Sequence, residues 1–252
     1  KPVKTGKRNV MKILNLYAGI GGNRKLWGGK HEITAVELDP AIAAVYQKHF
    51  PNDTVIVSDA HQYLLDHYAE YDFIWSSPPC PSHGQYRHNV GFKAKGYPAL
   101  FPDMKLYEEI LLLQHHHKGL YVVENTKPYY KPLVEPTITL ARHLIWSNFE
   151  IEPATFEPRK ISTRNRLSDY PEFDIYGTDI KNKRQVMRNC VDPNLGLHVL
   201  IASLTNLDTT GKHLKFDEAD PEVTQLVNDN IDELFDQPTP ELTTKHKEQE
   251  ES

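Results

Sequence analysis

Cys80 is the residue in this 252-residue chain that most directly suggests covalent chemistry. It closes the segment Ser77-Pro78-Pro79-Cys80, after an apolar run at 71–75, and the two prolines restrict the backbone before the sulfur. A thiolate held there could add to C6 of a pyrimidine and turn C5 into an enamine carbon able to take a methyl group. Taken alone, the segment also fits a structural cysteine.

The pair Glu124-Asn125 ends a second apolar run, at 120–123. Addition of a cysteine to cytosine needs a proton or a strong hydrogen bond at N3, where negative charge develops. A glutamic acid held near the ring could provide it. The alternative is an acid that caps the following helix.

A glycine-rich turn follows the first apolar run and reads Tyr17-Ala18-Gly19-Ile20-Gly21-Gly22. Glycines let a ligand approach the backbone closely. Glu37 and Asp59 end the next two apolar runs, where a carboxylate can accept hydrogen bonds from ribose hydroxyls. These features predict an adenosine ligand, and the short turn favours S-adenosylmethionine over a dinucleotide. A tight turn with two solvent-facing acids is the alternative.

The elements that must position these residues alternate between apolar runs and amphipathic segments. Strands are predicted at 12–17, 33–36, 54–57, 71–75 and 120–123, and helices at 40–50, 60–68 and 102–117. The alternation predicts an α/β, Rossmann-like fold with a mostly parallel sheet, helices on both faces, and ligand sites at the carboxyl ends of the strands. Beyond these we expect extended segments at 148–161, a loop at 167–183 and a helix after Pro193.

The composition is that of a soluble globular protein, with 39% hydrophobic and 25% charged residues and no apolar run near the roughly 20 residues that span a bilayer. We divide the chain into a leader at 1–10, a catalytic domain at 11–205 and a tail at 206–252 with an amphipathic helix at about 222–235. Residues 216–252 hold twelve acidic side chains against two lysines, which leaves a net charge of +5 on the rest. That charge is compatible with a polyanionic partner.

In content and order, these motifs resemble those of the DNA cytosine-5 methyltransferases, over about residues 11–205. The family's glycine turn matches residues 17–22, its Pro-Cys pair matches Pro79-Cys80, and its Glu-Asn pair matches Glu124-Asn125. Its QxRxR motif matches residues 162–166. Its C-terminal GNxV motif, which folds back beside the first motif, matches residues 188–191.

The resemblance implies a role for each matched residue. Cys80 is the nucleophile, Glu124 supports N3, Arg164 positions the base, and Arg166 positions the glutamate or the backbone. The implied catalytic residues are Cys80, Glu124, Arg164, Arg166, Pro79 and Asn125. The implied contacts to S-adenosylmethionine, which leaves as S-adenosylhomocysteine, are Tyr17, Ala18, Gly19, Ile20, Gly21, Gly22, Glu37, Leu38, Asp59, Ala60, Pro78, Asn189 and Val191. No metal is implied, because the sulfonium is already the electrophile.

The chain departs from the family pattern at Asn15, usually Asp, at Pro81 and Ser162, usually Gln, and at Arg188, usually Gly. It also has only about twenty residues, 167–187, where family members usually carry a long target-recognition region. A small member with reduced recognition is therefore expected. Recognition could fall to the loop 84–101, to the tail, to a second subunit of a homodimer, or to another protein.

The loop 84–101 interleaves cations with aromatic rings, as expected of a segment that closes over a nucleic-acid strand. A lid without nucleic-acid contact is the alternative. The expected contacts in and beside this loop are Ser82, Tyr86, Arg87, His88, Lys93 and Lys95. The three histidines at 115–117 look like a metal tract, but consecutive helical residues point about 100° apart and could not easily share an ion.

The resemblance thus implies an enzyme that methylates C5 of a flipped cytosine in DNA, in the cytoplasm of a bacterial or phage-infected cell, as restriction-modification enzymes do. Two alternatives stay open: a transfer RNA cytosine-5 methyltransferase on the same scaffold, and a non-catalytic regulatory subunit. The presence of Cys80, Glu124 and Arg164 together argues against the second.

Overall fold

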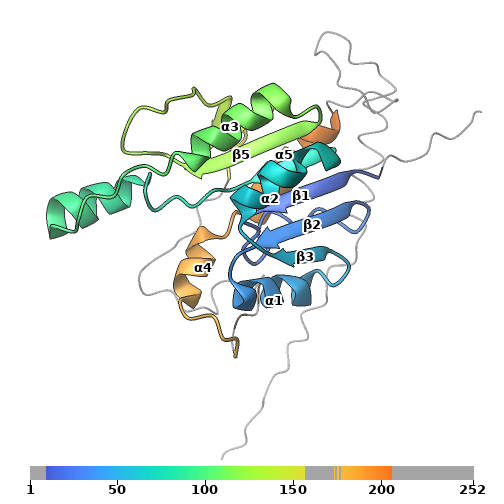
Figure 1. Cartoon of the computed structure of the whole chain (residues 1–252), viewed down its shortest axis with the longest axis horizontal. Helices are drawn as coiled ribbons and strands as arrows, with labels where there is room; N and C mark the ends of the chain where they lie inside the picture. Colours follow the sequence, from blue (N-terminus) through green and yellow to red (C-terminus); the bar gives the residue numbers. More distant parts are fainter. Residues whose placement is uncertain (1–9, 157–172, 174, 176, 206–252) are drawn as a thin grey trace, which may run out of the picture.

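A seven-stranded sheet forms the centre of the protein, with the strand order β3-β2-β1-β4-β5-β7-β6 (Figure 1). The computed structural model describes residues 10–156, 173, 175 and 177–205. The strands are β1 (Lys12–Leu16), β2 (Glu32–Glu37), β3 (Thr54–Val57), β4 (Phe73–Ser76), β5 (Leu120–Thr126), β6 (Ile138–Leu140) and β7 (His143–Ser147). β1 to β5 pair in parallel, whereas β7 runs antiparallel to both β5 and β6.

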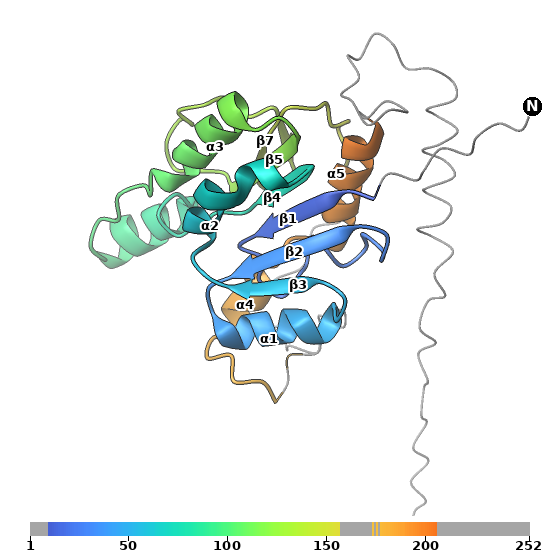
Figure 2. The same cartoon turned by 45° about the vertical axis from the view of Figure 1, so that its right-hand side comes forward.

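Helices cover both faces of this sheet (Figures 1 and 2). They are α1 (Pro40–His49), α2 (Ala60–His67), α3 (Lys105–His116), α4 (Lys183–Asn189) and α5 (Pro193–Thr205), with a 3-10 turn at Tyr68–Glu70 and a π-helical segment at Arg87–Ala94. Leu64 of α2 and Ile110 of α3 join one buried cluster, with Leu14 of β1. Leu195 of α5 joins the cluster on the opposite face, with Ile13. Neighbouring residues of β1 therefore alternate between the two layers.

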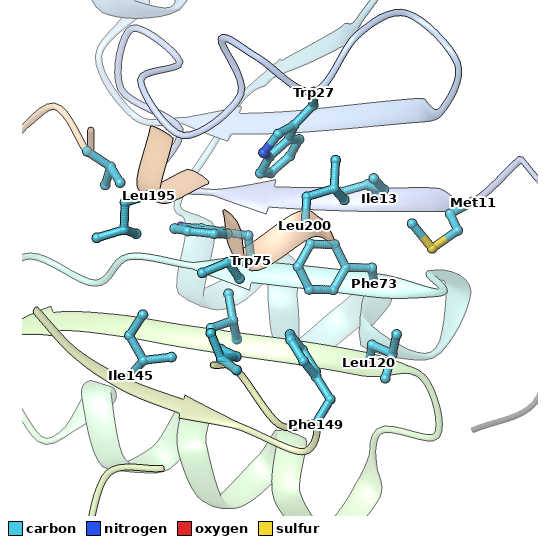
Figure 3. Packing of buried hydrophobic residues seen from close by; sticks show 14 of the residues in the cluster. Met11, Ile13, Trp27, Phe73, Trp75, Leu120, Ile145, Phe149, Leu195 and Leu200 are labelled. Carbon is cyan, nitrogen blue, oxygen red and sulfur yellow. The ribbon is translucent and has the colours of Figure 1, made fainter. Parts of the chain in front are cut away.

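The core on the α5 side is rich in aromatic rings (Figure 3). Trp27 is fully buried, and its ring centroid lies 5.8 Å from that of Trp75 and 6.4 Å from that of Phe73. Its indole Nε1 donates a hydrogen bond to the carbonyl of Gly196, at 3.0 Å. This bond satisfies the one polar group of the buried ring and ties the segment after β1 to α5.

The predicted fold class is confirmed, and the predicted strands and helices up to residue 123 are present with boundaries shifted by at most three residues. The β6–β7 hairpin and α4 were not predicted. Residues 148–156, where extended segments were expected, form no strand of the sheet, and the expected loop 84–101 contains the π-helical segment. The leader up to residue 9, the rest of 148–161 and the tail helix lie outside the described residues.

Candidate active site

The residues that the sequence analysis predicted to be functional lie at the carboxyl ends of the parallel strands. The glycine turn follows β1, Glu37 ends β2, Cys80 follows β4, and Glu124 lies near the end of β5. Because β1, β2, β4 and β5 run in parallel, all of these residues lie along the same edge of the sheet.

The glycine turn bends sharply after β1. Tyr17, Gly19 and Gly21 all have positive φ angles, of 55°, 56° and 86°. A side chain at Gly19 would meet no atom within 4 Å, so its backbone borders open space. The amide of Gly19 donates to Oε2 of Glu37 at 2.9 Å, which locks the turn to the end of β2. The open backbone at Gly19 fits a ligand that approaches the chain closely.

Gly21 and Gly22 serve packing instead of ligand access. A Cβ at Gly21 would lie 2.2 Å from the ring of Phe50. A Cβ at Gly22 would lie 2.3 Å from both the sulfur of Cys190 and the carbonyl oxygen of Val191. The segment matched to the last motif therefore packs directly against the first, as the resemblance implied. Val191 is itself buried, whereas Asn189 is exposed at the end of α4.

Two buried polar contacts that the sequence did not reveal brace this turn. Asn15 and Asn23 exchange amide hydrogen bonds, the shorter at 2.8 Å. Asn15 therefore satisfies the hydrogen-bonding groups of the buried Asn23 side chain without placing a charge in the core. Arg24 pairs with Asp53 through two bonds, Nε to Oδ2 at 2.8 Å and Nη2 to Oδ1 at 3.0 Å, and the hydroxyl of Tyr46 donates to the same carboxylate at 2.8 Å. The turn is thus anchored to the start of β3.

The Tyr17 side chain of the turn is held by a residue of α3. The Tyr17 hydroxyl donates to Oε1 of Glu109 at 2.6 Å, and Ser76 Oγ donates to Oε2 at 2.5 Å. Glu109 lies on α3 and is fully buried, and Nδ1 of His61 lies 3.0 Å from its Oε1. Burial first, and then the nearby Glu109 charge, raise the pKa of Tyr17 far above its usual value. Tyr17 is therefore fixed as a neutral hydrogen-bond donor.

The predicted ribose and adenine contacts lie beside the turn. Glu37 Oε1 accepts a second backbone bond, from Asp39 at 2.9 Å, and each of its oxygens keeps a lone pair for a further donor. Leu38 is 66% exposed and offers an apolar surface next to Glu37. Asp59 caps α2 by accepting from the amide of Gln62 at 3.0 Å, and this bond lowers the pKa of its carboxyl group. Ala60 is buried beneath it. Asp59 thus has a structural role whatever it binds.

Cys80 lies half-buried in a tight turn after β4. Its carbonyl accepts from the amides of His83 at 3.0 Å and Gly84 at 2.9 Å. Pro78 before it is buried, and Asn125 Nδ2 donates to the Pro78 carbonyl at 2.9 Å, so the Glu-Asn motif clamps the Pro-Cys motif. Pro79 is exposed. Burial raises the pKa of the Cys80 thiol, the Thr126 hydroxyl opposes this shift, and the Glu124 charge adds to it.

Glu124 is a buried carboxylate with an imidazole partner that the sequence analysis missed. Oε1 of Glu124 contacts Nδ1 of His143, the first residue of β7. Burial alone would raise the pKa of Glu124, but His143, Ser77 and Arg142 together hold it below its usual value. Strand alternation sends Glu124 to the α5 face and Asn125 to the α3 face, so these neighbours contact different partners. The only sequence signal for His143 is its place just before the apolar run at 144–146.

The segment expected to contact nucleic acid is a short helix that projects from the body of the protein (Figures 1 and 2). Ser82, Arg87 and His88 make internal contacts there. Ser82 Oγ accepts from the Asp103 amide, the Arg87 guanidinium lies over the Tyr97 ring, and the His88 ring stacks on Tyr129 with 3.9 Å between centroids. In contrast, the side chains that stay exposed are Tyr86, Lys93 and Lys95.

Several expected sites lie partly or wholly outside the described residues. Arg164 and Arg166 are among these, so their predicted roles stay predictions. In the part of the reduced recognition region that the structure describes, Phe173, Ile175 and Ile180 are buried in a cluster with α1. These positions supply core packing and not a surface for reading bases.

The described part of the chain holds neither a metal-binding cluster nor a membrane-spanning helix. No group of three or more His, Cys, Asp or Glu side chains there is arranged to hold a metal ion. Among the same residues, no helix has the length and apolar character needed to cross a membrane.

Residues 11–111 match the family model of the C-5 cytosine-specific DNA methylases. The match confirms the predicted resemblance over the part of the chain that holds the glycine turn and Cys80, and with it S-adenosylmethionine as the methyl donor. A search among curated proteins found no match.

Three solved structures illustrate what the fold is similar to. A candidate methyltransferase of Escherichia coli, yhhF, is 18% identical, with 54% of this chain and 75% of that chain covered and a TM-score of 0.35. DNMT2 of Spodoptera frugiperda is 27% identical, with 46% and 35% covered and a TM-score of 0.31. A TehB-like SAM-dependent methyltransferase of Corynebacterium glutamicum is 18% identical, with 48% and 57% covered and a TM-score of 0.31.

Proposed function

We propose that this protein transfers a methyl group from S-adenosylmethionine to C5 of cytosine in DNA, through a covalent bond between Cys80 and C6. One observation carries the proposal: Asn125 Nδ2 donates to the Pro78 carbonyl at 2.9 Å and so joins the Glu-Asn and Pro-Cys segments at the sheet edge that also holds the open glycine turn. The family match over residues 11–111 supports the same chemistry.

Different residues of this chain would bind the methyl donor and position the nucleophile. Gly19, Glu37 and Leu38 would hold the methyl donor, which supplies an electrophilic methyl group when bound. The Pro78-Pro79 segment, clamped by Asn125, aims the Cys80 sulfur. Because C6 is attacked from the face of the ring, the target base must leave the stack before it can reach the sulfur.

The protonation states require one rearrangement before addition. Burial leaves Cys80 as a thiol at rest, and the His143 contact leaves Glu124 ionised, so this pair carries one proton. When the sulfur bonds to C6, the C5–C6 π electrons form a C4–C5 double bond, the C4–N3 π electrons move to N3, and N3 gains a proton. The sulfur loses one proton and N3 gains one, so addition needs no net proton from solvent. Glu124 accepts the proton from the Cys80 thiol and delivers it to N3.

When bound, S-adenosylmethionine would supply the methyl group to C5 and leave as S-adenosylhomocysteine. Loss of the C5 proton to water and cleavage of the C6–S bond then restore the C5–C6 double bond, and the N3 proton returns through Glu124 to the Cys80 sulfur. Exposed Lys93, Lys95 and Tyr86 on the projecting helix would contact the nucleic-acid strand through its phosphates and bases. Phe173, Ile175 and Ile180 of the short recognition region are buried, so these three side chains offer no surface for reading bases. RNA is therefore included as a test substrate.

The decisive assay measures tritiated methyl transfer to duplex DNA, single-stranded DNA and transfer RNA. Cys80→Ser should abolish transfer, while Cys190→Ser, the same change at the other cysteine, should retain it once its fold is verified by circular dichroism. DNA with 5-fluorocytosine should form a covalent adduct with the wild type and none with Cys80→Ser. Transfer that survives Cys80→Ser would refute the mechanism, and transfer confined to transfer RNA would refute the DNA substrate.

A further inference from the structure

The imidazole that contacts Glu124 comes from the neighbouring strand, β7, and not from the strand of Glu124 itself. In the antiparallel β5–β7 pair, Glu124 lies opposite Ile145 and Thr126 lies opposite His143. Glu124 and His143 are therefore diagonal neighbours on one face of the sheet, within reach of each other's side chains. Both are buried, with side chains 6% and 9% exposed, and Nδ1 of the ring meets Oε1 of the carboxylate.

The second ring nitrogen of His143 also has a partner. Nε of Arg142 donates to Nε2 of His143 at 3.3 Å. A guanidinium can only donate, so Nε2 must accept, and the ring proton lies on Nδ1, directed at Glu124. Arg142 is itself held, because its Nη2 donates to the carbonyl of Arg188 at 2.9 Å.

This chain of contacts joins two motifs that are far apart in sequence. Arg188 begins the segment 188–191, in which Cys190 and Val191 pack against Gly22 of the glycine turn. Glu124 is thus connected through His143 and Arg142 to the segment that closes the cofactor side of the site.

We propose that His143, with its tautomer set by Arg142, is the positioning residue of Glu124: it orients the carboxylate and keeps it ionised in the resting enzyme. The catalytic meaning of this role rests on the proposed function, whereas the protonation of Glu124 does not. His143 engages Oε1 of the carboxylate, and the Ser77 hydroxyl gives the carboxylate a further bond.

The other groups that face Glu124 cannot replace His143. Ser77, after β4, is a neutral hydrogen-bond donor. Cys80 is a thiol at rest, and Thr126 on the same strand is neutral. Arg142 carries a fixed charge, but it is exposed and reaches Glu124 through His143. Without the imidazole, burial would dominate and Glu124 would hold its proton to a higher pH.

The test follows the carboxyl group of Glu124 directly. Protein labelled with ¹³C at the glutamate carboxyl carbon is titrated by NMR between about pH 4 and 8, and Glu124→Gln identifies the signal by its loss. In the wild type, the Glu124 midpoint should lie below that of an ordinary glutamate, because its neighbours, His143 above all, hold down the pKa of its carboxyl group. In His143→Gln, this midpoint should rise by about 1–3 units. An unchanged Glu124 midpoint in His143→Gln would overturn the proposal.

Two further variants keep the outcome decisive. His67→Gln breaks an exposed contact of the same kind, His67 Nδ1 to Glu70 at 2.8 Å, and should leave the Glu124 titration unchanged. Should His143→Gln fail to fold, Arg142→Gln changes an exposed residue and should raise the Glu124 midpoint by a smaller amount. An unchanged midpoint in Arg142→Gln would then overturn the proposal.

Methyl transfer gives the second readout. His143→Gln should lower kcat and also shift the limb of the kcat/KM profile that Glu124 governs to higher pH. A role in folding alone would lower the rate equally at every pH and would leave that limb in place. If no substrate accepts a methyl group at all, the proposed function fails, while the NMR titration still decides the role of His143.

Discussion

The buried ion pair behind the glycine turn should control both the stability of the fold and the cofactor site. Asp53 and Arg24 are 7% and 6% exposed, and the Asp53 carboxylate accepts three hydrogen bonds, two from Arg24 and one from Tyr46. Asp53→Asn keeps the side-chain shape and leaves the Arg24 charge uncompensated. Removal of one partner of a buried pair costs about 3–5 kcal/mol. We expect the lower end, because the remaining amide oxygen still accepts one bond.

The assay is urea unfolding followed by circular dichroism, and the matched control is Asp66→Asn. Asp66 is exposed on α2 and accepts only from Gln62, at 3.1 Å, so its loss should cost less than about 0.5 kcal/mol. The double variant Arg24→Met with Asp53→Asn should regain part of the lost stability, because it removes the buried charge altogether. A loss below about 1 kcal/mol for Asp53→Asn, the range of surface ion pairs, would refute the reasoning.

The same variant should also weaken S-adenosylmethionine binding, measured by isothermal titration calorimetry. Arg24 lies two residues after Gly22, so an unpaired Arg24 would shift the turn that fits the cofactor. Unchanged affinity in a destabilised Asp53→Asn would show that the turn is held by its other contacts alone.

Two further outcomes follow from the same core. Gly22→Ala should lower both the melting temperature and the cofactor affinity, because its methyl group would lie 2.3 Å from the Cys190 sulfur. The control Gly29→Ala, whose methyl group would meet no atom within 4 Å, should change neither. Equal melting temperatures of the two variants in scanning fluorimetry would contradict this prediction. The hydrogen bond to Glu109 raises the pKa of His61, so the stability that this pair contributes is complete below about pH 6.5 and is lost as pH rises through the folded-state pKa. The unfolding free energy of the wild type minus that of His61→Gln should therefore shrink between about pH 6 and 9, and a constant difference would contradict the coupling.

Local patterns in the sequence determined the parallel half of the fold and the approximate place of the site. Apolar runs of four to six residues alternate with amphipathic segments there, and each pattern depends only on neighbouring residues. Asp39 and Asp59 before α1 and α2 are helix caps of the kind that a short polar side chain forms with the following amides. Glu37, Cys80 and Glu124 could be placed at one edge because each follows a strand of a parallel sheet.

Only the tertiary structure decided which partners these residues have. β7 enters the sheet antiparallel between β5 and β6, and this register brings His143 to Glu124. No local pattern marks that contact, because a histidine before an apolar run reads the same whether it faces solvent or a buried acid. The Arg24–Asp53 pair likewise joins the turn after β1 to the turn before β3. The sequence therefore specifies which groups are chemically capable, whereas strand pairing and helix packing determine their charges, because burial and the nearest partner set each pKa.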